Sequence, residues 1–282
     1  MTDSPNNTSK ASPPTGGESI SKNGRSNQPN RIAHNAGSSD REFLAKEPIG
    51  NRIYIGHIPQ NGSLALTGVG VCMPLIMIIS AFAALVGNGG APRATIYMGK
   101  NKKDDAEKIL GNCFTMQIIL SVILTAVLLI WNRDLLLAFG ASKNTINYAT
   151  SYMNIYAIGT IFVQLTLGMN NFITAQGFAK TGMLSVLIGA IANIILDPIF
   201  IFALHMGVKG AALATIISQG CSCIWVLSFL FGKRTTLRIR VKNLGLQASY
   251  ILPCLALGSA VFIMQGSESI ISVCFNSSLL KY

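Results

Sequence analysis

Charged residues are scarce in this sequence of 282 residues, at 12% against roughly 25% in soluble proteins. Acidic residues are the scarcest, since five of the 11 lie within residues 1–50 and only six remain for the other 232 residues. Half of all residues are apolar. This composition excludes an ordinary soluble protein. It also makes Asp197 and Glu268, the two acids inside long apolar stretches, the first candidate functional residues.

Features of several other protein classes are missing as well. The net charge of +11 does not indicate a nucleic-acid partner. Nucleic-acid-binding proteins gather their Lys and Arg residues on one solvated face, whereas the Lys and Arg residues here are kept out of the apolar stretches. The first fifty residues contain no apolar stretch of the kind that a secretion signal requires. They are rich in Ser, Asn, Pro and Gly, and they predict a disordered tail over residues 1–50.

Catalytic and cofactor motifs are also missing. All six cysteines lie in apolar stretches, which indicates a structural role rather than a metal site or disulfide bonds. The Gly87 to Gly90 stretch lacks the Gly-Lys-Ser/Thr ending of a phosphate loop, so we expect it to serve close helix packing. An intramembrane enzyme would need a catalytic pair, but His34, His57 and His205 lie in polar breaks or at the ends of apolar stretches. We therefore expect no enzymatic activity and no organic cofactor.

Six long apolar runs begin at residue 64, and each is close to the roughly 20 residues with which a helix crosses a bilayer. Four runs contain no charge and two contain one acid each; the runs are Leu64–Val86, Ile109–Trp131, Ala149–Met169, Met183–Leu204, Gly210–Phe231 and Tyr250–Phe275. A soluble helical protein would show polar faces at the helical period instead. The sequence predicts an all-α, multi-pass protein of the cell membrane, with the lipid bilayer as its surroundings.

Basic residues are unequally distributed between the loops, and they predict an orientation because Lys and Arg are held on the cytoplasmic side. Ten bases lie at residues 100–108, 180 and 233–242, in the first, third and fifth loops, against four in the alternate loops and the stretch before the first run. Lys233–Lys242, in the fifth loop, is thus predicted to be cytoplasmic. The first run would then start outside the cell. The tail before it would also have to lie outside, although it has six basic residues and no secretion signal to carry it across. A further spanning segment before residue 51 would resolve that conflict.

Three stretches carry more specific motifs. They are Arg52-Ile-Tyr-Ile-Gly-His-Ile-Pro59; Gly87-Asn-Gly-Gly-Ala-Pro92 with the loop Gly99–Glu107; and Gln176-Gly177 with Asn193-Ile-Ile-Leu-Asp-Pro198 and Gly207–Thr215. Together they resemble the multidrug and toxic compound extrusion (MATE) family of antiporters, over about residues 51–282. The third set is the most specific.

Members of this family have twelve helices in two lobes, and the resemblance assigns the six runs to the second through seventh helices. It implies a polar tail over residues 1–50, an incomplete N-terminal lobe over 51–232, a basic interlobe loop over 233–248 and the first helix of the C-terminal lobe over 249–282. The lead-in to the first helix directly adjoins its exit at Gly50 and Asn51. We therefore expect an internal deletion and a C-terminal truncation.

Asp197 is the central predicted site residue, because an ionisable group inside a membrane is costly unless it is paired, protonated or water-facing. Asn193 lies four residues earlier on the same helix face, and Pro198 removes the hydrogen bond that would occupy the carbonyl of Ile194. The resemblance adds Thr215 and implies that the three side chains form a site for a proton or a sodium ion. The alternative is that Asp197 is simply hydrated near the end of its helix.

The resemblance also implies roles for four other polar residues. The family has an acid in its first helix where this sequence has Asn51. Glu268 matches an acid in the cation site of the C-terminal lobe, with a plain interfacial position as the alternative. Asn171 and Gln176 flank the third loop, in a region that lines the substrate cavity of the family, but polar residues at helix ends are common.

The function implied by the resemblance is proton- or sodium-coupled export of small, cationic, amphipathic compounds. The absence of Lys and Arg inside the six runs favours cationic cargo over the anionic cargo of a lipid-linked saccharide flippase on the same general fold. The third possibility is a non-transporting membrane remnant, because alternating access needs two lobes around a shared site. We expect the 282-residue chain not to transport by itself; its oligomeric state stays open.

Overall fold

A computed structural model describes residues 54–56 and 62–279, without the side chains of residues 275–277 and 279. The tail predicted over residues 1–50, and Asn51, lie outside the described residues. Within them the chain is helical, with no strand.

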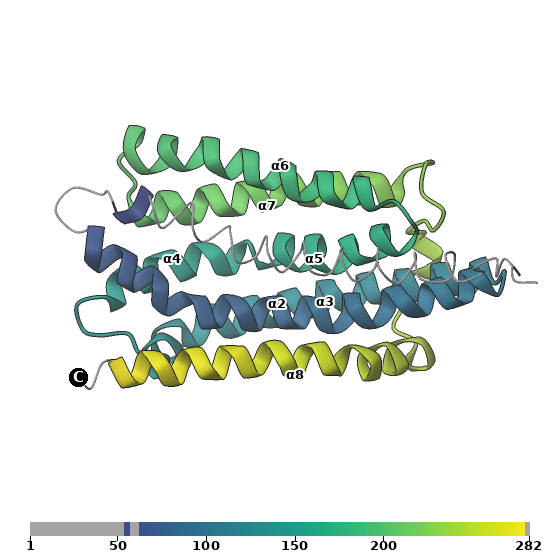
Figure 1. The fold of residues 1–282 in the computed structure, drawn as a ribbon, viewed down its shortest axis with the longest axis horizontal. Coiled ribbons are helices and arrows are strands. Elements are labelled where there is room, and N and C mark those ends of the chain that lie inside the picture. The colour runs from purple at the N-terminus through teal and green to yellow at the C-terminus, as the bar shows by residue number, and fades with distance from the viewer. Residues whose placement is uncertain (1–53, 57–61, 280–282) are drawn as a thin grey trace, which may run out of the picture.

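All six apolar runs form helices, which confirms the predicted all-α membrane fold. The elements are α2 (Gly62–Gly99), α3 (Lys103–Ala138), α4 (Ile146–Ile158), α5 (Thr160–Ala175), α6 (Ala179–Pro198), the π-helical turn η1 (Ile199–Ala203), α7 (Val208–Phe231), the 3-10 turn η2 (Val241–Asn243) and α8 (Ala248–Leu279). In the described part of the chain, five helices are long and apolar enough to cross a membrane singly, and α4 with α5, taken together as a bent pair, reaches the same length and hydropathy. The helices lie side by side along one axis (Figure 1).

The third run is not one continuous helix as its sequence suggested. It bends by 57° between α4 and α5, at Gly159. A β-carbon at Gly159 would collide with the side chain of Ile216 on α7. Glycine thus lets α7 approach the bend closely, a tertiary contact that the hydropathy of the run does not reveal.

The first two spans are longer than their apolar runs. At about 1.5 Å per residue, the 38 residues of α2 extend well beyond the ~30 Å hydrocarbon core of a bilayer. The extension carries Arg93, which lies outside the apolar run, so the absence of Lys and Arg inside that run still holds. α3 starts six residues before its run and has a non-helical backbone at Trp131.

The helix α8 packs along α2, at the opposite edge of the bundle from α6 and α7 (Figure 1). The two helices cross at glycines: a β-carbon on Gly258 would collide with the carbonyl of Leu85, and one on Gly89 with the carbonyl of Cys254. Gly87 and Gly90 likewise leave no room for a β-carbon beside α5 and α3. The expected packing role of the Gly87 to Gly90 stretch is thereby confirmed.

The ends of α2, α5 and α7 lie together with the starts of α3, α6 and α8; we call this the basic end and the opposite one the far end (Figure 1). The chain between α7 and α8, residues 232–247, is called the linker. Its Leu237 and Ile239 are buried in the apolar core of the basic end, beside Leu230 of α7. The linker is therefore a packed part of the bundle.

Candidate ion-coupling site

The helix α6 has an inverted distribution of side chains. Its buried residues contain no apolar side chain: they are Gly182, Ser185, Gly189, Asn193 and Asp197. Its large apolar residues point outward, where lipid would surround them, as in Met183, Ile191 and Ile194, which are 62%, 50% and 56% exposed. A polar face turned to the bundle interior is the usual position of ionisable residues in membrane helices.

Asp197 and Asn193 form the centre of this face. Nδ2 of Asn193 donates a hydrogen bond to Oδ1 of Asp197 at 3.3 Å, one helical turn away, and Asp197 has no exposed surface. The α-helical hydrogen-bond pattern ends at this point, because Pro198 has no N–H. The next residues form the π-helical turn η1, and the N–H of Leu204 donates to the carbonyl of Ile199. π-helical turns of this kind frequently occur at functional sites.

Thr215 lies across from this Asn–Asp pair on α7. Two contacts set the register of the antiparallel helices: Gly189 lies against Ser222, and Phe200 lies against Gly210. Because both helices rise equally per residue, Thr215 is level with the pair. Thr215 is buried, and its Oγ1 donates to the carbonyl of Ala211 at 2.9 Å. The structure thus brings the three predicted site residues of α6 and α7 to one level of the bundle.

The polar interior continues toward the basic end, which the sequence interpretation missed. Ser222 Oγ on α7 donates to the backbone carbonyl of Ser185 on α6 at 2.8 Å, and Ser185 Oγ donates to Oδ1 of Asn170 on α5 at 3.3 Å. All three residues are buried. The signal was present in the sequence, because the buried positions of α6 recur every three or four residues from Gly182 to Asp197.

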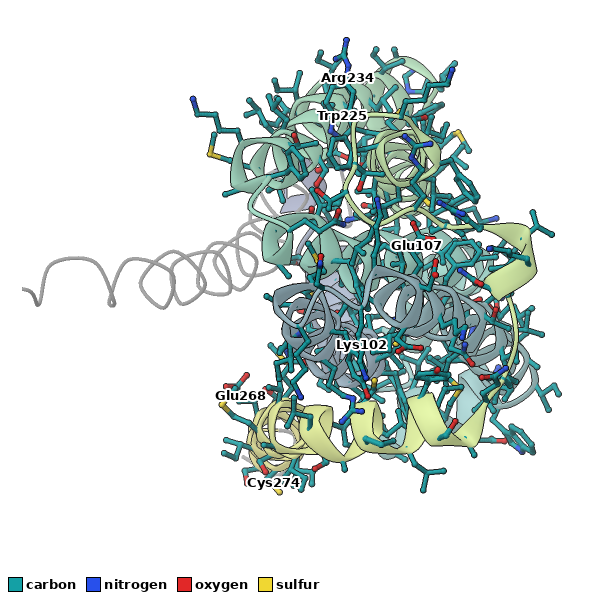
Figure 2. The ribbon with its side chains drawn as sticks, turned by 90° about the vertical axis from the view of Figure 1, so that its right-hand side faces the viewer. Lys102, Glu107, Trp225, Arg234, Glu268 and Cys274 are labelled. Carbon is teal, nitrogen blue, oxygen red and sulfur yellow. The ribbon has the colours of Figure 1, made fainter. Side chains whose placement is uncertain are left out.

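Glu268 lies far from this group, on α8 at the other edge of the bundle. Its side chain is exposed and projects away from the neighbouring helices (Figure 2). The next residue, Ser269, is buried and donates to the carbonyl of Pro74 on α2 at 2.9 Å.

Asn171 and Gln176 are also separate from Asp197, toward the basic end. Asn171 lies against Gly87 of α2. Oε1 of Gln176 accepts hydrogen bonds from the hydroxyl of Thr235 at 2.8 Å and from the backbone N–H of Leu237 at 2.7 Å. Gln176 therefore fastens the linker to the end of α5.

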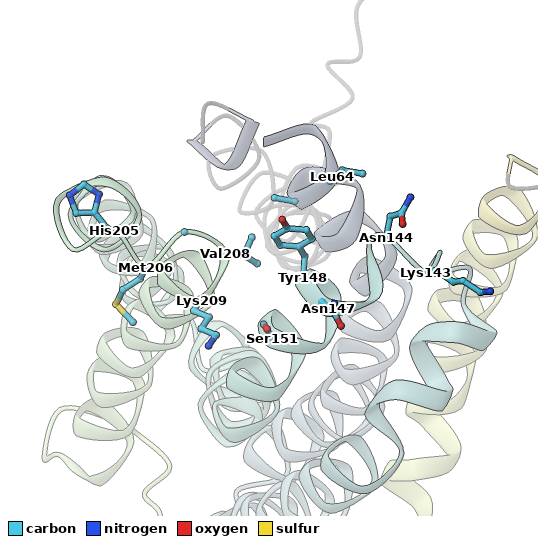
Figure 3. Close-up of a pocket in the computed structure, with 12 residues that line it drawn as sticks. Leu64, Lys143, Asn144, Asn147, Tyr148, Ser151, His205, Met206, Val208 and Lys209 are labelled. Carbon is cyan, nitrogen blue, oxygen red and sulfur yellow. The ribbon is translucent and has the colours of Figure 1, made fainter. Parts of the chain in front are cut away.

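A pocket of about 910 Å³ opens at the far end (Figure 3). It is enclosed by the first turns of α2, α4 and α7 and by the loops that precede α4 and α7. Lys143 and Lys209 line it together with His205 and polar groups from α4, whereas Asp197 does not. The other lining residues are Leu64, Ala65, Asn144, Asn147, Tyr148, Ser151, Met206, Gly207 and Val208.

Comparison with known proteins decides the family. The MatE family profile matches residues 52–199, which is more than half of the chain and includes Asn193 and Asp197. This chain belongs to the MatE family. The expected multi-pass position in the cell membrane follows from this membership and from the apolar helices.

Individual MatE relatives cover the chain unequally. The multidrug export protein MepA of Staphylococcus haemolyticus is 26% identical over 232 residues, which are 82% of this chain and 51% of that protein. An FAD transporter of Shewanella oneidensis is 27% identical over 165 residues, 57% of this chain and 36% of that protein. An inward-facing multidrug resistance MATE family transporter matches with a TM-score of 0.78 and 28% identity, covering 83% of this chain and 53% of that one. The chain thus spans about half the length of the MepA relative.

Proposed function

We propose that this chain supplies one lobe of an ion-coupled exporter, in which Asp197 binds and releases the coupling ion. The main support is the position of the Asp197 carboxyl group. It has no exposed surface, lies on the polar interior face of α6, is hydrogen-bonded to Asn193 and is level with Thr215. Secondary transporters place ion sites at such interrupted helices near the middle of the membrane. The coupling ion is a proton or a sodium ion, for which carboxylate, amide and hydroxyl oxygens are suitable ligands.

The first candidate cargo is a cationic, amphipathic drug-like compound. One support is the name of the MepA relative, a multidrug export protein. The other is the scarcity of basic residues near Asp197: in the described parts of α5, α6 and α7 they are Lys180 and Lys209, in the first turns of α6 and α7. A compound with one positive charge would meet no buried cation on these helices.

The second candidate cargo is an anion. It is favoured by the pocket at the far end, which contains Lys143 and Lys209 and no acidic residue. The positive ends of α2, α4 and α7 also converge there, and helix N-termini attract anions. The relative named as an FAD transporter is consistent with this class. Lys143→Ala with Lys209→Ala should reduce export of an anionic dye and leave that of a cationic dye unchanged.

Efflux from cells tests the role of Asp197. The chain is expressed in a drug-sensitive host together with the second half of the staphylococcal relative, so that two lobes are present, and ethidium efflux is measured. Asp197→Asn should abolish efflux with membrane expression intact, whereas Asp134→Asn, at an exposed acid beyond the apolar run of α3, should leave efflux unchanged. Equal efflux by the two variants would refute the proposed role.

A further inference from the structure

Two of the six cysteines meet in the core of the basic end, although they come from separate apolar runs. The thiols of Cys113 on α3 and Cys254 on α8 are hydrogen-bonded to each other. The two residues are 2% and 1% exposed. Sγ of Cys254 also lies 3.0 Å from the backbone carbonyl oxygen of Tyr250, one turn earlier on α8. Both sulfurs are therefore held together inside the bundle.

Two successive glycines of α2 let the two cysteines approach. A β-carbon on Gly90 would lie 2.6 Å from Sγ of Cys113, and one on Gly89 would collide with the carbonyl of Cys254. Any larger residue at either position would push α3 or α8 away from α2. The backbone of α2 thus sets the position of both cysteines.

A positive charge lies beside the two thiols. Arg93 follows Gly90 by three residues, so the two lie on one face of α2. Its charge acts on both Cys113 and Cys254. Nε of Arg93 is buried and has no hydrogen-bond partner among the residues that the structure describes. A guanidinium in this position can balance a negative charge that forms on the sulfurs.

Two thiols beside a cation have the chemistry of a two-coordinate site for a soft metal ion. Thiolate sulfur is the kind of ligand that selects Cu(I). When two thiols bind Cu(I), two metal–sulfur bonds form and both thiol protons leave, so the complex carries one negative charge. The guanidinium of Arg93 makes the whole site neutral, and a neutral group is far less costly inside a protein than an unpaired charge.

The number of ligands argues against the commoner structural metal. Zinc in structural sites takes four ligands in a tetrahedral arrangement. In the described residues, no group of three or more His, Cys, Asp or Glu side chains could hold a metal ion. A pair of thiols therefore suits an ion that accepts two ligands, as Cu(I) does.

We propose that Cys113 and Cys254 form a binding site for one Cu(I) ion, with the charge of the complex balanced by Arg93. The site lies near the basic end, because Tyr250, one turn before Cys254, donates from its hydroxyl to Oδ1 of Asp105 in the first turn of α3 at 3.0 Å. That end is predicted to face the cytoplasm, where thiols are kept reduced. The site involves neither Asp197 nor the cargo, so it goes beyond the proposed function.

The competing interpretation is that the two cysteines only fill space. A buried free cysteine behaves as a small apolar residue, and the glycines of α2 show that packing here is close. Replacing one sulfur by oxygen separates the two interpretations, because serine is of similar size and is a poor ligand for Cu(I).

The test is copper binding by the purified 282-residue chain, in detergent and without oxygen. Cu(I) is supplied as the complex of a coloured chelator, and the loss of colour measures the copper that the chain withdraws. The native chain should withdraw one equivalent more than Cys113→Ser or Cys254→Ser, and Arg93→Met should weaken the site at least tenfold. Cys223→Ser is the matched control, because Cys223 on α7 is equally buried; it should leave copper binding unchanged.

Two further readouts use the native chain and decide the question even if a variant folds poorly. X-ray absorption of the bound copper should show two sulfur neighbours, and copper should raise the melting temperature, as a ligand of the folded state does. Equal copper binding by the native chain and both serine variants, three or more sulfur neighbours, an unchanged melting temperature, or an unchanged affinity in Arg93→Met would overturn the proposal. None of these measurements involves transport, so they leave the proposed role of Asp197 to its own test.

Discussion

Nε of Arg240 lies 2.9 Å from Oε2 of Glu107, and this ion pair joins the linker to the first turns of α3. The Glu107 side chain is 1% exposed and the Arg240 side chain 44%. The cation of the linker thus pairs with a carboxylate inside the protein; Figure 2 labels Glu107 among the helices. The linker is also held by Asn112, whose Oδ1 accepts from the backbone N–H of Gln247 at 2.6 Å. These contacts fix the start of α8 relative to α3.

Removing the arginine of this pair should destabilise the protein. Arg240→Ala leaves a buried carboxylate without its cation, at a cost on the order of 3 kcal/mol, and should lower the melting temperature in detergent. Glu107→Gln in the same chain should recover part of the loss because it removes the stranded charge. Arg234→Ala, at an exposed arginine of the linker, is the control. Equal melting temperatures for Arg240→Ala and Arg234→Ala would show that the pair contributes no stability.

A second prediction concerns the crossing of α2 and α8. Gly258→Val forces a side chain against the carbonyl of Leu85 and should cost about 2 kcal/mol, as overpacking of a tight contact does. Gly266→Val is a matched control on the same helix, because no heavy atom lies within 4 Å of its added β-carbon. The readout is the melting temperature of each variant. A loss that is as large at position 266 as at 258 would indicate a helix-propensity effect instead of a packing effect.

The orientation predicted from the basic loops can be tested by labelling. Lys143→Cys at the far end and Arg234→Cys in the linker are both exposed positions, and Cys274→Ser removes the exposed native thiol from the background. A membrane-impermeant maleimide should label position 143 and spare position 234 in intact cells, and should label both after lysis. Labelling of position 234 alone in intact cells would reverse the topology. Leu237 is unsuitable as a reporter, since it is buried.

Much of the fold could be predicted from the sequence, because hydrophobic length alone identifies spans in a membrane. Asp197 and Asn193 were recognisable for a related reason: a lone acid in an apolar run stands out, and one helical turn joins it to the amide. The bend at Gly159 was not predictable, because the run around it is uniformly apolar and the close contact of Gly159 with Ile216 involves a helix distant in the sequence. Gln176 was assigned to the cavity region, yet its hydrogen-bond partners come from a linker about sixty residues further along the chain.

The buried serines of α6 and α7 were overlooked for a different reason. Ser185 and Ser222 barely change the hydropathy of their runs, so a window average hides them. Their importance comes from the periodicity of burial on α6, where no large apolar side chain is among the buried residues. A test of periodicity within each apolar run would have placed them beside Asn193 and Asp197.

The most direct measurement of ion coupling at Asp197 is dye movement in proteoliposomes under an imposed ion gradient. The chain is combined with the second lobe of the MepA relative, and a fluorescent cationic dye is followed under a proton gradient and, separately, under a sodium gradient. We expect one of the two gradients to drive dye movement, Asp197→Asn to abolish it, and Asp134→Asn to leave it unchanged. Gradient-driven movement at the same rate in Asp197→Asn would contradict the assignment of Asp197 as the coupling acid.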